Sequence, residues 1–334
     1  MNKIKNPADD PTFPNPEPGL GWPWTFKHAP DISYPDDWPT ISIITPNFNN
    51  AKFLEETIRS VLLQAYPKLE YIIIDGGSTD GSVEIIKKYE PWISQWVSEK
   101  DEGQSHAINK GYNMATGDWL AFLNSDDIYY PFALIEVARF LQKHPKTEWI
   151  AADPRVFDDA GNELNIKKPD LADLDRPEKW LTYEVHIPQH SSFIHKCCLD
   201  KYSDLDERFQ YVFDLEYFMR LGAAHLTPVY LPEVIAGFRI HTTSKTSESR
   251  LPFLQEQEQL IDHYAPLMDS ETVAATRQKL SAMIADYFVY ESNEVATGPG
   301  GYHKAFQYLN AAVAKDWRVV KKRAFWGALK NLMF

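Results

Sequence analysis

The chain has 334 residues, 44% of them hydrophobic, which is enough for one large core or two modest ones. Its 47 acidic residues against 34 basic ones give a formal net charge of -13 at pH 7. This charge argues against a broad nucleic-acid-binding surface, so we expect no nucleic-acid partner. An anionic ligand would need local positive charges or a metal ion.

The cysteines and the hydropathy pattern indicate where the chain works. The two cysteines, Cys197 and Cys198, are adjacent and cannot form an ordinary structural disulfide with each other. No signal-peptide-like apolar segment opens the chain, and nowhere do about 18 apolar residues run together as a membrane-spanning helix requires. We therefore expect a cytoplasmic protein, at most peripheral on the inner face of the membrane.

Prolines dominate the beginning of the chain. Residues 1–39 contain nine of the 23 prolines and show no helix or strand periodicity, which predicts an extended arm. Trp22, Trp24 and Trp38 favour packing of this arm on the protein, because exposed indoles are uncommon without a partner. We expect an arm, a central domain in two halves and a helical end: 1–39, 40–250 (40–130 and 131–250) and 251–334.

After residue 40 the pattern alternates between β-rich runs and helical spacing. The apolar run at 41–45 precedes a helical pattern at 53–63, and the run at 71–74 precedes a second helix that begins near Val83. Two such units in succession predict an α/β fold whose mostly parallel central sheet is flanked by helices.

The continuous apolar run at 119–123 is typical of a strand buried on both faces. It stops on the acidic pair Asp126 and Asp127, at the sheet edge where open α/β folds bind ligands. Two neighbouring carboxylates repel each other unless a cation lies between them or they cap a helix. A helix is expected directly afterwards, with Pro131 as its first residue.

The rest of the chain continues this alternation and then becomes helical. We expect strands at 92–98, 149–156, 191–194 and 229–239, a turn at 158–162, a polar irregular loop at 163–186, and helices at 105–115, 215–221, 254–267, 273–290 and 304–314.

The last segment, 315–334, carries six basic residues and one acidic residue among apolar ones, which is typical of a basic amphipathic helix. Contact with an anionic membrane surface would explain this composition. Packing on the body of the protein or in a dimer explains it equally well, so the sequence leaves both alternatives open.

Three polar loops close three strands of the expected sheet and should outline one crevice. The glycines of the second loop allow close approach of a ligand, and Asp75 can accept hydrogen bonds from a base N–H or a ribose hydroxyl. Neither Gly-x-Gly-x-x-Gly nor the P-loop motif is present, which argues against a dinucleotide enzyme or a P-loop NTPase. What remains is a crevice that binds a nucleotide through carboxylates and a metal. The loops are Thr45-Pro46-Asn47, Asp75-Gly76-Gly77-Ser78 and Asn124-Ser125-Asp126-Asp127.

In order and spacing, five segments resemble the nucleotide-binding half of the family 2 inverting glycosyltransferases, of the bacterial polysaccharide-biosynthesis type. The resemblance covers residues 40–245 and implies the Rossmann-like GT-A fold, with 40–130 as nucleotide-binding half, 131–250 as acceptor half and a helical C-terminal extension. The segments are 43–49 (IITPNFN), 74–81 (IDGGSTDG), 107–111 (AINKG), 115–118 (ATGD) and 123–127 (LNSDD).

The resemblance implies a nucleotide-sugar donor, with a UDP-sugar favoured. Asn124 stands where many members have the first Asp of an Asp-x-Asp motif, which weakens the usual contact to ribose or metal, although an amide can still bond a hydroxyl. The implied donor-binding residues are Thr45, Pro46, Asn47, Asp75, Gly77, Asp101, Asn109, Lys110, Asn124, Ser125 and Asp126.

The resemblance also implies metal and catalytic residues. Asp126 matches the metal-binding aspartate, Asp127 adjoins it, and His241 matches the histidine of a late Arg-x-His motif, although a loop histidine can also be merely solvated. Oxygen ligands favour Mn²⁺ or Mg²⁺ over zinc. Asp214 matches the catalytic base at a helix start, with Glu216 as the second candidate; a simple helix cap is the alternative for Asp214.

The implied reaction is metal-dependent inverting transfer of one sugar to a hydroxyl of a glycan or lipid-linked acceptor. Gln189 and His190 are expected to face the acceptor, and the 163–186 loop to close over the donor. The Gln-x-x-Arg-Trp motif of processive members is absent, which favours single-sugar transfer. Two alternatives stay open: a sugar-phosphate nucleotidyltransferase, although 45–49 lacks the glycine and basic residues it would use, and a non-catalytic nucleotide-sugar-binding protein of the same fold.

Overall fold

The computed structural model describes residues 7, 10–14, 21–24, 35–64, 66–248, 250–296 and 301–333. Its contacts divide the chain into two units, one of Met1–Ala172 with His186–His241 and one of Asp173–Val185 with Thr242–Phe334. Most of the predicted arm lies outside the described residues. The three-part division of the chain stays a prediction.

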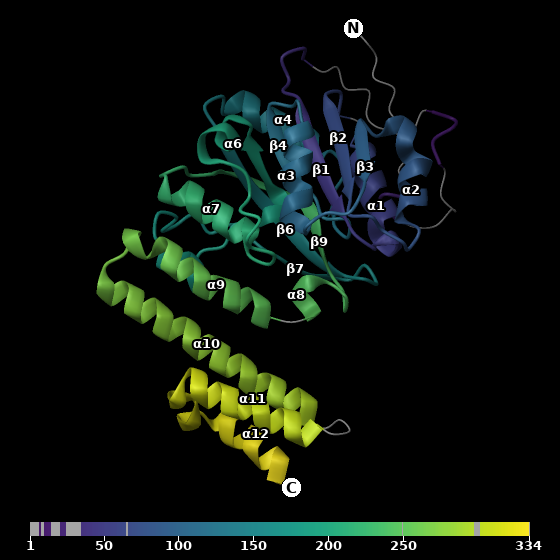
Figure 1. The fold of residues 1–334 in the computed structure, drawn as a ribbon. Helices are drawn as coiled ribbons and strands as arrows, with labels where there is room; N and C mark the ends of the chain where they lie inside the picture. The colour runs from purple at the N-terminus through teal and green to yellow at the C-terminus, as the bar shows by residue number, and fades with distance from the viewer. Residues whose placement is uncertain are drawn as a thin grey trace. The chain divides into compact units, whose positions relative to one another are not determined.

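One sheet organises the first unit (Figure 1). Its nine strands in the described residues follow the order β3-β2-β1-β4-β8-β6-β9-β5, with β7 beside β6. Six of them, β1, β2, β3, β4, β6 and β9, run in the same direction, so the predicted mostly parallel sheet is confirmed. The strands are β1 (Ile41–Asn47), β2 (Leu69–Asp75), β3 (Gln95–Ser98), β4 (Trp119–Phe122), β5 (Ile128–Tyr129), β6 (Trp149–Asp158), β7 (Glu163–Ile166), β8 (Ser192–His195) and β9 (Val229–Ile240).

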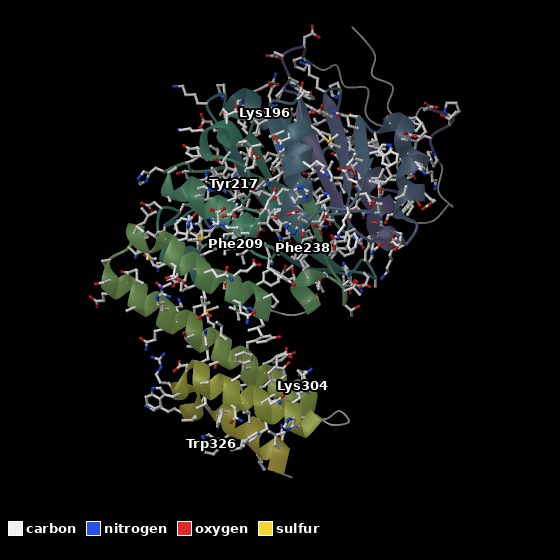
Figure 2. All side chains as sticks on the ribbon, viewed as in Figure 1. Lys196, Phe209, Tyr217, Phe238, Lys304 and Trp326 are labelled. Atoms are coloured by element: carbon white, nitrogen blue, oxygen red, sulfur yellow. The ribbon has the colours of Figure 1, made fainter. Side chains whose placement is uncertain are left out.

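Helices with one apolar face cover this sheet, as expected for an α/β protein (Figures 1 and 2). In α1 the buried residues Leu54, Ile58 and Val61 recur at three- to four-residue spacing and pack into the main core. The helical segments of this unit are α1 (Ala51–Leu62), α2 (Ser82–Tyr89), α3 (Gln104–Met114), α4 (Ala133–Lys143), α6 (Cys197–Tyr202) and α7 (Phe213–Ala223), with 3-10 turns at Glu90–Trp92 and Gln189–Ser191.

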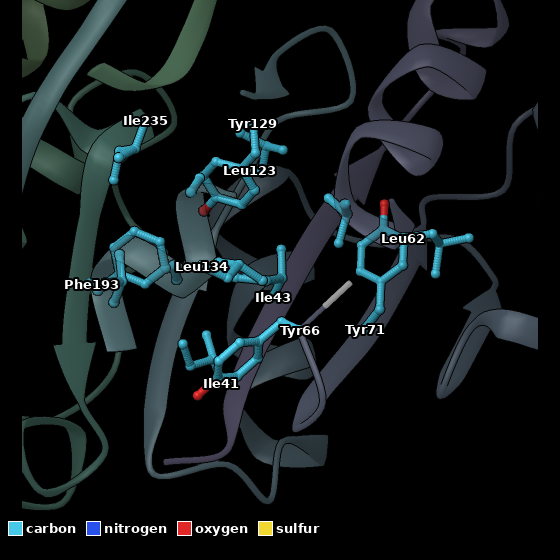
Figure 3. Close-up of a cluster of buried hydrophobic side chains, with 14 of the residues drawn as sticks. Ile41, Ile43, Leu62, Tyr66, Tyr71, Leu123, Tyr129, Leu134, Phe193 and Ile235 are labelled. Carbon is cyan, nitrogen blue, oxygen red and sulfur yellow. The ribbon is translucent and has the colours of Figure 1, made fainter. Parts of the chain in front are cut away.

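The core of this unit joins distant parts of the chain. Ile41 and Ile43 of β1, Leu134 of α4, Phe193 of β8 and Ile235 of β9 belong to one buried cluster (Figure 3). Every residue of β1, including Ser42 and Thr45, is buried, as is typical of a central strand of a parallel sheet. Because β1 pairs in parallel with β2 and β4, the carboxyl ends of these three strands meet at one edge.

The described tryptophans at the beginning of the chain contact the body of the first unit. The indole N–H of Trp22 donates to the carbonyl of Tyr129 at 2.7 Å. The buried ring of Trp38 stacks on Tyr66 with 5.5 Å between centroids. The guanidinium of Arg59 lies 5.1 Å from the ring of Trp24.

Two sequence predictions at this level were wrong in detail. α4 begins at Ala133 instead of Pro131, because Phe132 adopts a left-handed backbone with φ of 67° that separates the proline from the helix. The expected irregular loop 163–186 contains β7 and the short helix α5 (Pro177–Leu181). β7 is only four residues long, so its polar–apolar alternation, Glu-Leu-Asn-Ile, is at the lower limit of a recognisable strand pattern, and all four residues are exposed.

The second unit is helical, so the predicted helical extension is confirmed. Its small core includes Val319, Phe325 and Ala328. The expected single basic helix over 315–334 was wrong: Asp316 caps a 3-10 turn by accepting from the N–H of Arg318, and a separate helix starts at Arg323. The helical segments are α5, α8 (Lys245–Glu248), α9 (Leu251–Tyr264), α10 (Ser270–Ala296), α11 (Gly301–Lys315), α12 (Arg323–Met333) and the 3-10 turns Ala265–Leu267 and Trp317–Lys321. Among the described residues, no helix combines the length and apolar character that crossing a membrane requires.

Candidate functional site

The ends of β1 and β2 are held together by the side chain of Asp75. Its Oδ1 accepts from the amide of Asn47 at 2.7 Å and the hydroxyl of Ser78 at 2.6 Å. Its Oδ2 accepts from the hydroxyl of Ser98 at 2.6 Å and the N–H groups of Ser78 and Gly77 at 2.9 and 3.2 Å. Burial acts to raise the pKa of Asp75, but the hydrogen bonds from Ser78 and Ser98 outweigh it and lower the pKa. Asp75 is therefore a fixed carboxylate with both oxygens engaged.

The two polar side chains of the first loop, Thr45 and Asn47, are both buried but differ in their hydrogen bonding. Thr45 is fully buried, and its hydroxyl accepts from the hydroxyl of Tyr71 at 3.1 Å. Asn47 is also buried, and its Oδ1 accepts no hydrogen bond from the described residues. A buried acceptor without a donor costs free energy, so Asn47 Oδ1 is suited to a ligand N–H. The side chain of Thr45 points into the protein instead.

An aromatic ring that the sequence reasoning missed lies beside this edge. Phe48 directly follows β1 and is 63% exposed, which is unusual for so large an apolar side chain. A Cβ added to Gly76 would lie 3.2 Å from Phe48 and 2.6 Å from Oδ2 of Asp101. Because Gly76 has no side chain, the Asp101 carboxylate and the Phe48 ring can both lie close to its backbone. Gly77 next to it has φ of +82°, a conformation that favours glycine.

Two predicted donor-binding residues of α3 are engaged elsewhere. The amide of Asn109 binds both backbone groups of Leu205, at 2.9 and 3.0 Å, and Oε1 of Glu207 at 2.8 Å. Lys110 forms an ion pair with Glu99 at 2.5 Å. Their role in donor binding stays a prediction, and the contacts of Asn109 show it fixing the segment that leads into α7.

Hydrogen bonds from two neighbouring segments hold the loop after β4. Oδ1 of Asn124 accepts from the amide of Gln104 at 2.7 Å, and the hydroxyl of Ser125 accepts from the amide of Asn50 at 2.9 Å. These bonds connect the loop to the start of α3 and to the residue before α1. They fix the backbone from which Asp126 projects.

The two consecutive aspartates point in different directions. Asp127 is 1% exposed, and its oxygens accept from the backbone N–H of Arg239 at 2.9 Å and the amide of Asn124 at 3.2 Å. Burial raises the pKa of Asp127 well above its usual value, and the neighbouring Asp126 carboxylate adds to this rise. Asp126 instead has a 21% exposed side chain. Only Asp126 of this pair is therefore open to a ligand.

Asp126 lies next to His241 at the end of β9. Oδ2 of Asp126 is 2.9 Å from Nε2 of His241, and the His241 ring packs on Phe53 at 4.5 Å. The guanidinium of Arg239 donates to the carbonyl of Asp126 at 2.8 Å and to Glu56 at 2.6 Å. The structure thus brings two predicted metal ligands, Asp126 and His241, together and turns Asp127 inward.

The donor atoms at this point suit a divalent cation. A carboxylate oxygen and an imidazole nitrogen are ligands that Mn²⁺ accepts, and phosphate oxygens or water can complete its coordination. The pair supplies two protein ligands. Within the described residues, the cluster with three candidate ligand side chains is a different one, formed by Glu148, Cys197 and Cys198.

The two candidate bases on α7 have different surroundings. Asp214 lies in the first turn and lines a cavity of about 10 Å³, roughly the size of one water, together with Phe122, Gln189 and Tyr217. Glu216 is 2% exposed and forms an ion pair with Arg220 at 2.7 Å. Asp214 therefore borders a small cavity beside β4, and Glu216 is held in an ion pair with Arg220.

Gln189 and His190 hold the same region from the other side. The amide of Gln189 donates to the carbonyl of Phe122 at 2.6 Å. Nε2 of His190 lies 3.6 Å from Oδ2 of Asp127, and its ring stacks against Phe238 with 4.2 Å between centroids. Both residues therefore border the loop that carries Asp126.

Comparison with known proteins identifies the family. Residues 42–194 match the model for glycosyl transferase family 2. An uncharacterized glycosyltransferase of Mycobacterium tuberculosis is 33% identical over 204 residues, which are 60% of this chain and 75% of that protein. The chain belongs to glycosyl transferase family 2. Another relative of this glycosyltransferase, an uncharacterized glycosyltransferase of Rickettsia typhi, is 26% identical over 83% of this chain and 86% of its own length.

Solved structures confirm the predicted GT-A fold of this family 2 glycosyltransferase. TarS of S. aureus, residues 1–349 with UDP-GlcNAc, has a TM-score of 0.54, 14% identity and 88% coverage of both chains. The mannosyltransferase PcManGT of Pyrobaculum calidifontis, solved with GDP-Man and Mn²⁺, has a TM-score of 0.52 and 17% identity over 84% of this chain and 87% of its own. The chain spans about half, 53%, of a longer TarS structure.

Proposed function

We propose that this glycosyltransferase transfers a single sugar from a nucleotide-sugar, with a UDP-sugar favoured, to a hydroxyl of a glycan or lipid-linked acceptor with inversion. The observation that carries the proposal is the 2.9 Å contact between Asp126 and His241 at the carboxyl end of β4. The ligands in the complexes of the structural neighbours, UDP-GlcNAc and GDP-Man with Mn²⁺, support a nucleotide-sugar donor.

Asp126 and His241 are the proposed ligands of Mn²⁺ or Mg²⁺. A cation bound there would neutralise the negative charge that develops on the departing diphosphate. Asp127 has its oxygens engaged by Arg239 and Asn124, so we assign it the positioning of the loop instead of metal binding.

The ends of β1 and β2 are the proposed nucleoside site. The buried Oδ1 of Asn47 can accept a base N–H, and the exposed ring of Phe48 offers a flat face on which a base can stack. Asp101, held beside Gly76, can accept a hydrogen bond from a ribose hydroxyl. Asp75 supports this site by fixing Asn47 and the glycine loop.

Asp214 is the proposed general base. It lies in the first turn of α7, where the positive end of the helix dipole favours the charged carboxylate. This carboxylate would take the proton of the acceptor hydroxyl as the oxygen attacks the sugar. Attack on the side opposite the departing diphosphate inverts the anomeric carbon.

We also propose cytoplasmic action with peripheral membrane contact through the 315–334 region. Trp317 and Trp326 are 61% and 58% exposed, although the apolar residues between them are used in the core of the second unit. Lys321 and Arg323 are exposed nearby in the chain. Exposed indoles beside basic side chains are typical of anchors at an anionic lipid surface.

Thermal unfolding of the full chain with nucleoside diphosphates and nucleotide-sugars, with and without Mn²⁺, tests the proposal. One nucleotide should stabilise the protein in a metal-dependent way, by roughly 2.7 kcal/mol at 100 times its dissociation constant. Asp126→Ala should remove the metal dependence, whereas Asp200→Ala, at an exposed position of α6, should keep it.

The second arm of this test separates binding from transfer. Asp214→Asn should keep donor binding and lose sugar transfer. Stabilisation of the wild type without any turnover would favour the non-catalytic alternative, and synthesis of a nucleotide-sugar from a triphosphate would favour the nucleotidyltransferase. Full transfer activity in Asp214→Asn would show that another residue is the base.

A further inference from the structure

Lys167 follows β7 and is placed over an aromatic ring. Its backbone N–H donates to the carbonyl of Pro154 at 3.1 Å, which fixes the residue at the end of the β6–β7 hairpin. Its Nζ lies 5.3 Å from the ring centroid of Phe238, and the His190 ring stacks against the same Phe238. We call Lys167, Phe238 and His190 the Lys167 stack; Phe238 is labelled in Figure 2.

The positive charge of this stack has no counter-ion among the residues that the structure describes. Lys167 is half-buried, and no carboxylate of the described residues lies within ion-pair distance of its Nζ, although most other half-buried lysines and arginines of the chain are paired. Burial lowers the pKa of Lys167, and the burial of His190 together with the Lys167 charge lowers the pKa of His190 to about 3, so the imidazole is neutral. Nδ1 of His190 is buried and has no partner among the described residues. The stack therefore contains the positive charge of the Lys167 ammonium and, at Nδ1 of His190, a ring nitrogen without a hydrogen-bond partner among the described residues.

Phe238 projects from the side of β9 opposite to Arg239, and His190 extends from it to the Asp127 carboxylate at 3.6 Å. Successive strand residues project to opposite faces, so Phe238 and Arg239 point apart. The Arg239 guanidinium and the His241 ring both pack on Phe53, at 4.8 and 4.5 Å, and share one side. His190 adjoins Gln189, which lines the cavity next to Asp214.

We propose that Lys167, supported by Phe238 and His190, binds an anionic group of the acceptor, a phosphate or a carboxylate. This inference rests on the proposed function, because it takes the Asp214 side of β9 as the acceptor side. A half-buried ammonium binds such a group more strongly than an exposed one, since water competes less. Desolvation of the charge is then compensated when the acceptor is bound.

Binding of sugar probes to the full chain tests the inference. Glucose, glucose 6-phosphate and glucuronate are titrated by calorimetry into the protein with UDP and Mn²⁺ at constant ionic strength. The charged sugars should bind more tightly than glucose. Lys167→Met should weaken that binding by roughly tenfold, as loss of a charge-assisted hydrogen bond implies, while Lys167→Arg should largely keep it.

The matched control is Lys168→Met, the exposed neighbouring lysine, which should leave binding of the charged sugars unchanged. Equal binding of glucose and glucose 6-phosphate, or an unchanged affinity in Lys167→Met, would overturn the inference. Weaker UDP binding in Lys167→Met would assign the charge to the donor and overturn it as well. If UDP fails to bind the wild type, the proposed donor is wrong, and a Lys167-dependent preference for charged sugars would still support the anion site.

Discussion

The backbone N–H of Arg239 donates a hydrogen bond to Oδ1 of Asp127 at 2.9 Å. This bond joins the end of β9 to the loop after β4, although the two residues are 112 positions apart. It is the reason that His241, two residues further on, reaches Asp126. Asp127 therefore helps to position His241 beside Asp126, the two proposed metal ligands.

Asp127→Asn should destabilise the protein and weaken metal binding. An amide can keep one acceptor, but its NH₂ group would face the amide of Asn124, which is itself a donor. We expect a loss of about 1–3 kcal/mol in the free energy of unfolding, the usual cost of an unsatisfied buried polar group. Urea unfolding measures it, with Asp126→Asn at the partly exposed neighbour as the control. Equal losses in both variants would contradict the structural role of Asp127.

Asp75 should make the stability of the protein depend on acid pH. Its folded-state pKa is lower than in the unfolded chain, so the unfolded state binds more protons between the two values and stability rises with pH there. The contribution is complete above the ordinary value of 3.8 and is lost as the pH falls through the folded-state pKa. Urea unfolding from about pH 5 downward should show a steeper loss in the wild type than in Asp75→Asn once the pH falls below about 4. Parallel pH profiles would contradict this assignment.

Gly76→Ala should impair nucleotide binding and leave the fold intact. The new methyl group would lie 2.6 Å from the Asp101 carboxylate and 3.2 Å from Phe48, so both side chains must move. We expect the affinity for the stabilising nucleoside diphosphate to fall by roughly tenfold, about 1.4 kcal/mol. Gly327→Ala, where a methyl group meets nothing within 4 Å, is the control. Unchanged affinity in Gly76→Ala would place the nucleoside elsewhere.

Glu216→Gln should reduce stability, in contrast to Asp214→Asn. Glu216 is buried against Arg220, whose guanidinium also donates to the carbonyl of Asp204 at 2.9 Å. Loss of the charge leaves Arg220 without its counter-ion, which we expect to cost about 1–3 kcal/mol. Thermal unfolding measures both variants. A normal melting temperature in Glu216→Gln, together with loss of transfer, would make Glu216 the better base candidate.

Replacement of both exposed tryptophans should reduce membrane contact. Trp317→Ala with Trp326→Ala should lower co-sedimentation with vesicles of phosphatidylglycerol and phosphatidylcholine, while binding to pure phosphatidylcholine should be weak throughout. Phe306→Ala in α11, whose ring is 53% exposed, is the control. If the double variant instead changes the molecular mass in sedimentation analysis, the tryptophans serve a dimer contact.

The sheet and its ligand-binding edge could be predicted because their residues carry strong patterns. β1, β2 and β4 are rich in apolar and β-branched residues and end on polar loops, and the hydrogen-bond partners Asn47 and Asp75 stand where β1 and β2 end. β7 was not predicted, because its polar–apolar alternation spans only four residues within an otherwise polar segment. The interruption of the expected helix 315–334 was also not predicted. A single aspartate in a basic segment does not reveal that Asp316 accepts from the N–H of Arg318 and begins a 3-10 turn.

The directions of individual side chains were less accessible from the sequence. Asp126 and Asp127 are identical residue types, and their different directions go with contacts to distant residues, Arg239 for Asp127 and His241 for Asp126. Phe48 was missed although its position directly after a buried strand was a usable signal. The partners of Asn109 lie about a hundred residues away, a distance at which spacing carries no information.

The contacts of Asn109 bear on how such enzymes can be recombined. Asn109 lies on α3, in the proposed nucleotide-binding half. Its amide donates hydrogen bonds to Leu205 and Glu207, in the segment that precedes the proposed base Asp214. A chimera that takes residues 40–130 from a relative with another donor preference would lose these hydrogen bonds unless residues 205–207 come from the same relative. We therefore expect a change of the donor-binding residues to affect the position of Asp214, because the buried Asn109 connects the two regions.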